Sequence, residues 1–322
     1  MTTNKLLYFQ LGRQAFVSAL KLLNIGLGDL VLIPSLICDD VLSAIETVGA
    51  KPKFYEVDKH LRPSQLPHDA RVKAVLAVNY FGFAQDLQIF NEYCRVSGAT
   101  LIEDNAHGFL GADLDGNLLG SRAPLGFTSM RKTLRIADGA QLSINDTSLV
   151  SLAPQQLAFI SRRQPFRVQI LNLFRTMQSI TGIHFLDIAR IIVRKKRTFA
   201  TGSPLPKAFN GHDTIVPGAP MSSSITTMMH MDSVKESARR RKLFTSVTDL
   251  VSKSNAKPIY EELPNYCVPY GYPFWGDLET ASHVGKLLRH LHLEVIQWPE
   301  LPEEVSNNCP IHYKQLWVVN FL

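Results

Sequence analysis

The sequence predicts an α/β protein: a mostly parallel sheet with helices on both faces, followed by a smaller α+β domain. Three observations predict it. Short apolar runs alternate with helical patterns over the first 150 residues, two of the helical segments end at a glycine, and the pattern changes after that point. Strands separated by helices favour a parallel sheet, because parallel neighbours need a crossover of helical length.

Five apolar runs in the first half have the length and composition of strands. They lie at residues 31–36, 52–57, 73–79, 100–104 and 125–129. Helical patterns fall between them at 14–25, 38–49 and 84–97. The last two helices end at Gly49 and Gly98, where we expect a left-handed C-cap.

The second half begins with longer helical stretches rich in arginine and a loop-like region at 201–224. A helix is predicted at 230–253. The tail then mixes an extended PYGYPFW segment at 269–275, a helix at 278–292 and a strand at 293–296. We therefore expect two domains, residues 1–200 and residues 201–322, and no internal repeat.

The composition is that of a globular protein, with 322 residues of which 45% are hydrophobic. No run of about 18 uncharged apolar residues is present, and the amino terminus lacks a signal-peptide pattern, so we expect a cytoplasmic protein without a membrane span. The four cysteines lie far apart without a CxxC motif. Neither a disulfide framework nor a metal site is predicted.

The net charge of +6 comes largely from basic clusters at 190–197 and 239–242. Such runs are usually solvated helix faces. Recognition of an anionic substrate or a membrane surface is the alternative, and nucleic acid is disfavoured because no exposed aromatic residues interleave with the clusters.

Two residues at predicted strand ends carry candidate chemistry, because ligands of parallel sheets bind beyond the carboxyl ends of the strands. Asp104 could hold a positively charged ring nitrogen, as the pyridinium of pyridoxal phosphate requires. The amine of Lys132, after the next strand, could form a Schiff base. Near the amino terminus, Gly12 starts a helix whose free amides suit a phosphate.

The order of several short motifs narrows the prediction over about residues 10–142. They are GDLVLIPS at 28–35, GAKPKF at 49–54 with VD at 57–58, VNYFG at 78–82, EDNAH at 103–107 with Gly111, and Ser129 to Lys132 followed by DG at 138–139. In this order they resemble the pyridoxal-phosphate (PLP)-dependent sugar aminotransferases of the DegT/StrS type.

The resemblance implies an aspartate-aminotransferase-like large domain of PLP fold type I and a role for each motif residue. Asp104 would pair with the pyridine nitrogen, and Lys132 would carry the cofactor and shuttle protons. His107 would contact the ring or its phenolic oxygen. Gly12, Arg13 and Ser129 would bind the phosphate, with Arg13 replacing the usual threonine.

The implied activity is transfer of an amino group, with glutamate as the expected donor, to a nucleotide-linked keto-sugar for surface polysaccharide or related glycan synthesis. A homodimer is expected from the family. No metal and no nucleic acid are implied.

Several residues depart from the family pattern. Asn79 replaces a common histidine, Asn105 replaces an alanine, and Cys38 stands where many relatives have an aromatic residue. The second half resembles the family only thinly, through RRR at 239–241, PYGYP at 269–273 and WPELP at 298–302.

Two alternatives therefore stay open. One is a PLP enzyme of another reaction type, such as a dehydratase, although family dehydratases tend to lose the lysine. The other is a non-catalytic relative that binds a sugar nucleotide or a partner enzyme, which Arg13, Asn105 and the short carboxyl-terminal half would favour.

Overall fold

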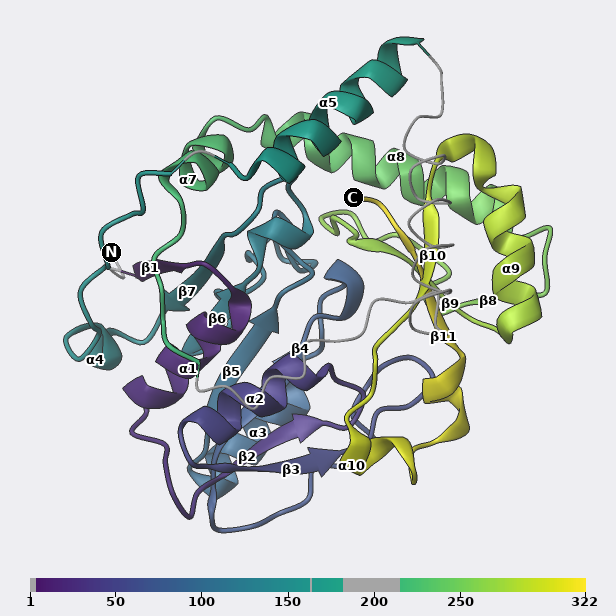
Figure 1. Ribbon diagram of the computed structural model, residues 1–322. Helices are drawn as coiled ribbons and strands as arrows, with labels where there is room; N and C mark the ends of the chain where they lie inside the picture. Colours follow the sequence, from purple (N-terminus) through teal and green to yellow (C-terminus); the bar gives the residue numbers. More distant parts are fainter. Residues whose placement is uncertain (1–3, 163, 182–214) are drawn as a thin grey trace.

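A computed structural model of the chain describes residues 4–162, 164–181 and 215–322 (Figure 1). Two sheets organise it: a seven-stranded sheet from the first half of the chain and a four-stranded sheet from the last third. The predicted division at residue 200/201 falls outside the described residues, as does the basic cluster at 190–197. The two-domain division stays a prediction.

The large sheet is mixed and mostly parallel, which confirms the predicted fold class. Strands β2 to β6 pair in parallel. Strands β7 and β1, neither of which was predicted as a strand, add the antiparallel part of the mixed sheet that the family resemblance implies. In spatial order the strands are β1 (Lys5–Phe9), β7 (Ala140–Ile144), β6 (Leu125–Thr128), β5 (Thr100–Asn105), β4 (Val72–Val78), β2 (Leu30–Pro34) and β3 (Lys51–Tyr55).

Helices cover both faces of this sheet. The connections β2–β3 and β4–β5 run in opposite directions across the sheet, so right-handed crossovers place their helices on opposite faces. These helices are α2 (Asp39–Thr47) and α3 (Gln88–Ser97); α1 (Gly12–Leu22) packs beside α2 (Figure 1). The glycines after α2 and α3 adopt positive φ, 82° at Gly49 and 74° at Gly98, as predicted for left-handed caps.

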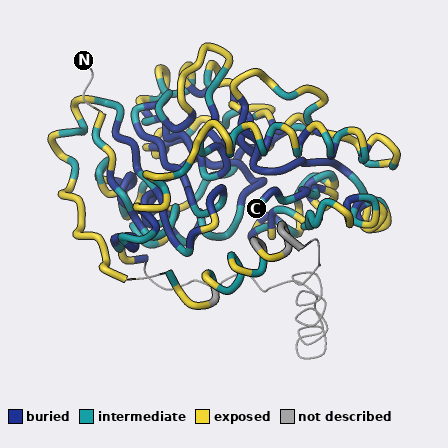
Figure 2. The backbone as a smooth tube through the Cα atoms, turned by 90° about the horizontal axis from the view of Figure 1, so that it is seen from above, coloured by how far each residue is buried: buried dark blue, intermediate teal, exposed yellow. Residues whose placement is uncertain are grey.

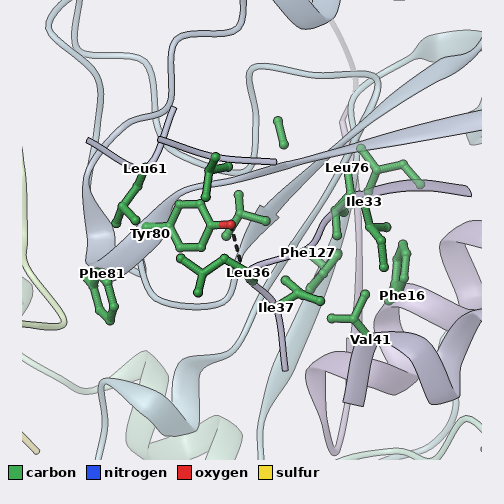
Figure 3. Close-up of a cluster of buried hydrophobic side chains, with 14 of the residues drawn as sticks. Phe16, Ile33, Leu36, Ile37, Val41, Leu61, Leu76, Tyr80, Phe81 and Phe127 are labelled. Carbon is green, nitrogen blue, oxygen red and sulfur yellow. Dashed lines mark hydrogen bonds between the residues drawn. The ribbon is translucent and has the colours of Figure 1, made fainter. Parts of the chain in front are cut away.

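The core lies between the sheet and these helices. Figure 3 shows part of it, where side chains from α1, from β2 and the loop after it, and from β4 and β6 meet. The rings of Phe16 and Phe127 lie 5.2 Å apart, and the Tyr80 hydroxyl donates to the Leu36 carbonyl at 2.9 Å. This packing forms the floor under the carboxyl ends of the central strands.

The last third of the chain forms an antiparallel sheet flanked by helices, as the mixed pattern predicted. Its strands run in the order β10 (Glu294–Gln297), β11 (Leu316–Asn320), β9 (Gly271–Trp275) and β8 (Lys257–Pro258). Strand β9 is the GYPFW part of the PYGYPFW segment. The main helices are α8 (Ser233–Val251) and α9 (Leu278–Leu287), with the shorter α10 (Glu303–Ser306).

Between the two sheets, the described part of the chain forms three further helices, α4 (Thr147–Val150), α5 (Phe166–Thr181) and α7 (Ser222–Met229). Helix α7 begins inside the predicted loop at 201–224, whose first part lies outside the described residues. Asp138 fixes its start by accepting hydrogen bonds from the Met221 amide at 3.0 Å and the Ser224 hydroxyl at 2.5 Å. This anchor lies some eighty residues away in the chain, so no local pattern indicates it.

The buried backbone runs through the middle of the molecule and the exposed segments outline its periphery (Figure 2). Within the described residues no helix combines the length and apolarity needed to cross a bilayer.

Candidate active site

The carboxyl ends of β4, β5 and β6 lie side by side at one edge of the large sheet. Val78 pairs with Asp104, and Asp104 pairs with Phe127 in the next strand. Two of these strands are followed by a short 3-10 turn, η1 (Tyr80–Gly82) after β4 and η2 (Met130–Lys132) after β6. The predicted chemistry at the strand ends is therefore brought together by the sheet itself.

Asp104 ends up buried at this edge, with 5% of its surface exposed. One carboxyl oxygen accepts a hydrogen bond from the Ala106 amide at 2.8 Å. Burial raises the pKa of the carboxyl to about 6, and the Ala106 amide and the charge of Lys132 only partly oppose that shift. A cationic group placed against this carboxylate would be held strongly.

His107 is held between aromatic rings from both halves of the chain. Tyr270 stacks on it at 4.4 Å between ring centroids and Phe81 at 5.6 Å, while Trp298 meets it edge-on at 5.3 Å. The Phe81 amide donates to Nδ1 at 3.4 Å. Burial, followed by the charge of Lys132, holds the pKa of His107 well below its ordinary value, so the ring is neutral.

The Lys132 amine lies 3.2 Å from Nε2 of His107. Its turn is fixed from the far half of the chain: the guanidinium of Arg240 on α8 donates to the Thr133 carbonyl at 2.8 Å and to the Tyr270 carbonyl at 3.1 Å. Arg240 is fully buried and also pairs with Glu236 at 2.7 Å. The buried Arg240 side chain thus links the backbone next to Lys132 to the backbone of Tyr270, whose ring stacks on His107.

The arginines of the basic cluster at 239–242 all have partners in the structure. Arg239 pairs with Glu236 and donates to the Phe321 carbonyl, and Arg241 donates to the carbonyls of Pro264 and Cys267. These three arginines fasten α8 to the surrounding backbone rather than forming a free basic face.

The opposite end of the site is formed by the start of α1 and by Ser129. A side-chain carbon built on Gly12 would lie 3.7 Å from Cβ of Ser129, so the helix start and the serine face each other. The Ser129 hydroxyl is buried, and none of the described residues forms a hydrogen bond with it. Arg13 is already paired, since its guanidinium lies 2.8 Å from the carboxylate of Asp40, which lines the same pocket.

A single pocket contains every site residue predicted from the sequence. Gly12, Arg13, Asp104, His107, Ser129 and Lys132 all line it, as does Cys38, whose thiol has a pKa raised mainly by burial. Their catalytic and binding roles stay predictions, but their common location is a fact of the fold. The pocket also includes Arg131 and Trp298, which the sequence reasoning did not assign.

The aromatic wall of the site was missed for a clear reason. Tyr270 and Trp298 lie in the PYGYP and WPELP segments, and the family resemblance of these segments assigns no function to either residue. More than 160 residues separate them from His107 in the chain, and nothing local indicates that they reach it. The segment that precedes Tyr270 can pack closely against the turn after β4 because residue 82 is a glycine. Gly82 adopts φ 89°, and a side chain there would meet the Val268 carbonyl oxygen at 2.6 Å.

Asn79, which lines the pocket, and Asn105 belong to a buried polar network at the strand ends. The Asn79 amide nitrogen donates to Glu103 at 2.8 Å, and its oxygen accepts from Arg122 at 2.9 Å. Arg122 in turn pairs with the fully buried Glu103 at 2.6 Å. Asn105 donates to the Leu119 carbonyl at 2.9 Å. Both asparagines are thus fully used in holding the strand ends.

The residues present fit pyridoxal 5′-phosphate, the cofactor that the resemblance implies. A buried carboxylate, an amine and a helix start with an unpartnered serine hydroxyl occupy one pocket. These groups match a pyridine nitrogen, an aldehyde and a phosphate in turn. Among the described residues no cluster of histidine, cysteine or acidic side chains could hold a metal ion.

The fold and this pocket define a class, the PLP-binding proteins of fold type I. Within it, the chain belongs to the DegT/DnrJ/EryC1/StrS aminotransferase family, whose model matches residues 8–172, just over half of the chain.

Among similar proteins is a dTDP-4-dehydro-2,3,6-trideoxy-D-glucose 4-aminotransferase of Saccharopolyspora spinosa, 29% identical over 206 residues, 62% of this chain and 52% of the relative. A UDP-N-acetyl-3-dehydro-alpha-D-glucosamine 3-aminotransferase of Acidithiobacillus ferrooxidans is 30% identical over 146 residues, 43% of this chain and 39% of the relative. The chain thus spans about half the length of these relatives or less.

The fold is similar over a longer stretch. The crystal structure of an aminotransferase from Streptoalloteichus hindustanus superposes with a TM-score of 0.64 at 18% identity, covering 98% of this chain and 80% of the other. At that identity the likeness shows the fold alone.

Proposed function

We propose that the protein is a PLP-dependent aminotransferase that passes an amino group from glutamate to a nucleotide-linked keto-sugar. The observation that carries the proposal is the meeting of Asp104, His107 and Lys132 in one pocket, with the Lys132 amine 3.2 Å from the imidazole. The names of the two relatives, one acting on a dTDP-linked and one on a UDP-linked keto-sugar, support the acceptor class.

Each residue then has a defined task. Bound PLP supplies an electron sink. Asp104 holds the proton on the pyridine nitrogen, and its own ionisation, which burial disfavours, is restored by that positive charge. The Lys132 amine would hold the cofactor and would serve as the base that moves the proton of the substrate carbon. His107, neutral and fixed by Phe81 and Tyr270, keeps the amine in place through Nε2.

The direct test follows the amino group in two half-reactions. Purified protein loaded with PLP should convert the cofactor to its aminated form when glutamate is added, and a panel of dTDP- and UDP-linked keto-sugars should reverse the change. The Lys132→Ala variant should do neither, whereas the exposed Lys73→Ala variant should behave as the parent. A protein that takes up no PLP would instead favour a non-catalytic relative, and cofactor binding without amination by glutamate would favour another reaction type.

The proposal also includes a homodimeric state, a cellular location and a biosynthetic role. A homodimer is supported by exposed large apolar side chains between residues 152 and 173, among them Leu152, Leu157, Phe166 and Leu173. Light scattering should give twice the mass of the chain, and a monomer at micromolar concentration would reject the dimer. A cytoplasmic location and a role in surface polysaccharide or related glycan synthesis are the parts of the proposal that rest on the family resemblance.

A further inference from the structure

Arg131 is a cation of the pocket to which the described residues supply no acidic partner. It lies on the turn η2 next to Lys132 and lines the same pocket as Gly12 and Ser129. Its Nε is buried without a hydrogen-bond partner. Within the described part of the chain, no acidic side chain forms an ion pair with it.

The other arginines near the site are engaged. Arg13 pairs with Asp40 at 2.8 Å, Arg122 with Glu103 at 2.6 Å, and Arg240 with Glu236 at 2.7 Å. A guanidinium carries five N–H donors and stays charged, so a shielded donor without an acceptor is unfavourable unless a ligand supplies one. Arg131 therefore differs from these three arginines in having no acidic partner among the described residues.

The groups beside Arg131 suit an anion with several oxygens. Ser129, two residues earlier, has a buried hydroxyl that is also unpartnered. Gly12 opens the eleven-residue helix α1 directly opposite this serine, and the first amides of a helix point outward with a favourable dipole. A phosphate would accept hydrogen bonds from all three sources at once.

We propose that Arg131, together with Ser129 and the amino end of α1, binds the 5′-phosphate of PLP, and that Arg13 does not. This inference rests on the proposed function in that it takes PLP as the ligand. It moves the cationic part of the phosphate site from Arg13, which the resemblance favoured, to a residue with no acidic partner.

The experiment compares PLP with pyridoxal, which lacks the phosphate, in titrations of cofactor-free protein. Arg131→Gln should weaken PLP binding by at least about tenfold and leave pyridoxal binding unchanged. Arg131→Lys should recover part of the loss, because it restores the charge without the fork of donors. The matched control, Arg13→Gln, should bind both ligands within about twofold of the parent. Inorganic phosphate should compete with PLP in the parent and much less in Arg131→Gln.

Other outcomes would overturn the inference. An equal loss of PLP and pyridoxal binding would make Arg131 a structural residue, and an unchanged affinity for PLP would remove it from the phosphate site. Unchanged PLP binding with a raised glutamate requirement would assign Arg131 to the carboxylate of the amino donor. A parent protein that binds neither PLP nor pyridoxal would overturn the proposed function along with the inference.

Discussion

The two halves of the site differ in how the chain encodes them. The first half supplies the reactive groups, each directly after a strand: Asp104 after β5 and Lys132 after β6. The last third supplies walls and fastenings: Tyr270 and Trp298 enclose His107, and Arg240 ties down the turn that bears Lys132. The reactive residues thus lie in short sequence motifs, whereas the contacts that position them join residues far apart in the chain.

The largest effect should come from removing a reactive group of the first half. Asp104→Ala should lower amino transfer by about a thousandfold or more, because no carboxylate would keep the ring nitrogen protonated. Steady-state rates with glutamate and the accepted keto-sugar measure it. The exposed turn residue Asp115 gives the matched control, Asp115→Ala, which should be unaffected. Comparable rates in the two variants would show that Asp104 has no role in the reaction.

Removing the main fastening should affect stability first. Arg240→Met leaves the carbonyls of Thr133, Pro269 and Tyr270 without their donor, so the free energy of unfolding should fall by about 3 kcal/mol. Urea denaturation measures this. Arg239→Met, on the same helix but partly exposed, should cost about 1 kcal/mol or less. Equal losses would mean that Arg240 has no special link to the site.

A smaller effect concerns the buried carboxyl of Asp104 in the cofactor-free protein. Its pKa of about 6 is raised above the unfolded value, so its contribution to stability is complete below about pH 4 and is lost as the pH rises through 6. Asp104→Asn has no such loss. Relative to the parent, the variant should therefore gain about 2 to 3 kcal/mol between pH 4 and pH 7.5. A difference independent of pH would show that the carboxyl is not desolvated.

The smallest effect serves as the reference far from the site. Gly98 ends α3 with φ 74°, so Gly98→Ala should cost about 1 kcal/mol of stability through strain in the left-handed region. PLP binding should be unchanged. A loss of cofactor affinity in this variant would indicate that the site responds to general destabilisation, which would weaken the contrast between the two halves.

The same contrast explains how much could be predicted from the sequence. The central strands, their helices and the glycine caps follow from local periodicity and turn chemistry, as at Gly49 and Gly98. The antiparallel edge could not be foreseen, because β1 and β7 stabilise one another across about 130 residues of chain. The common location of Asp104, His107 and Lys132 follows from parallel strands, whose carboxyl ends share an edge.

The remaining parts of the site depend on tertiary contacts that no short pattern carries. Arg240 sits in an ordinary basic run, and only burial against Thr133 and Tyr270 distinguishes it from Arg239 and Arg241. Arg13 stands at a phosphate-binding position of the family in place of the usual threonine, but its salt bridge to Asp40 could not be inferred from either residue alone. Asn79 and Asn105 looked like losses in the family pattern, and they prove to be members of a satisfied buried network.

The central claim is tested most directly by locating the covalent link. Protein incubated with PLP, reduced with borohydride and digested should yield one phosphopyridoxylated peptide, modified at Lys132. Modification spread over exposed lysines, or confined to a lysine outside the pocket, would contradict the account.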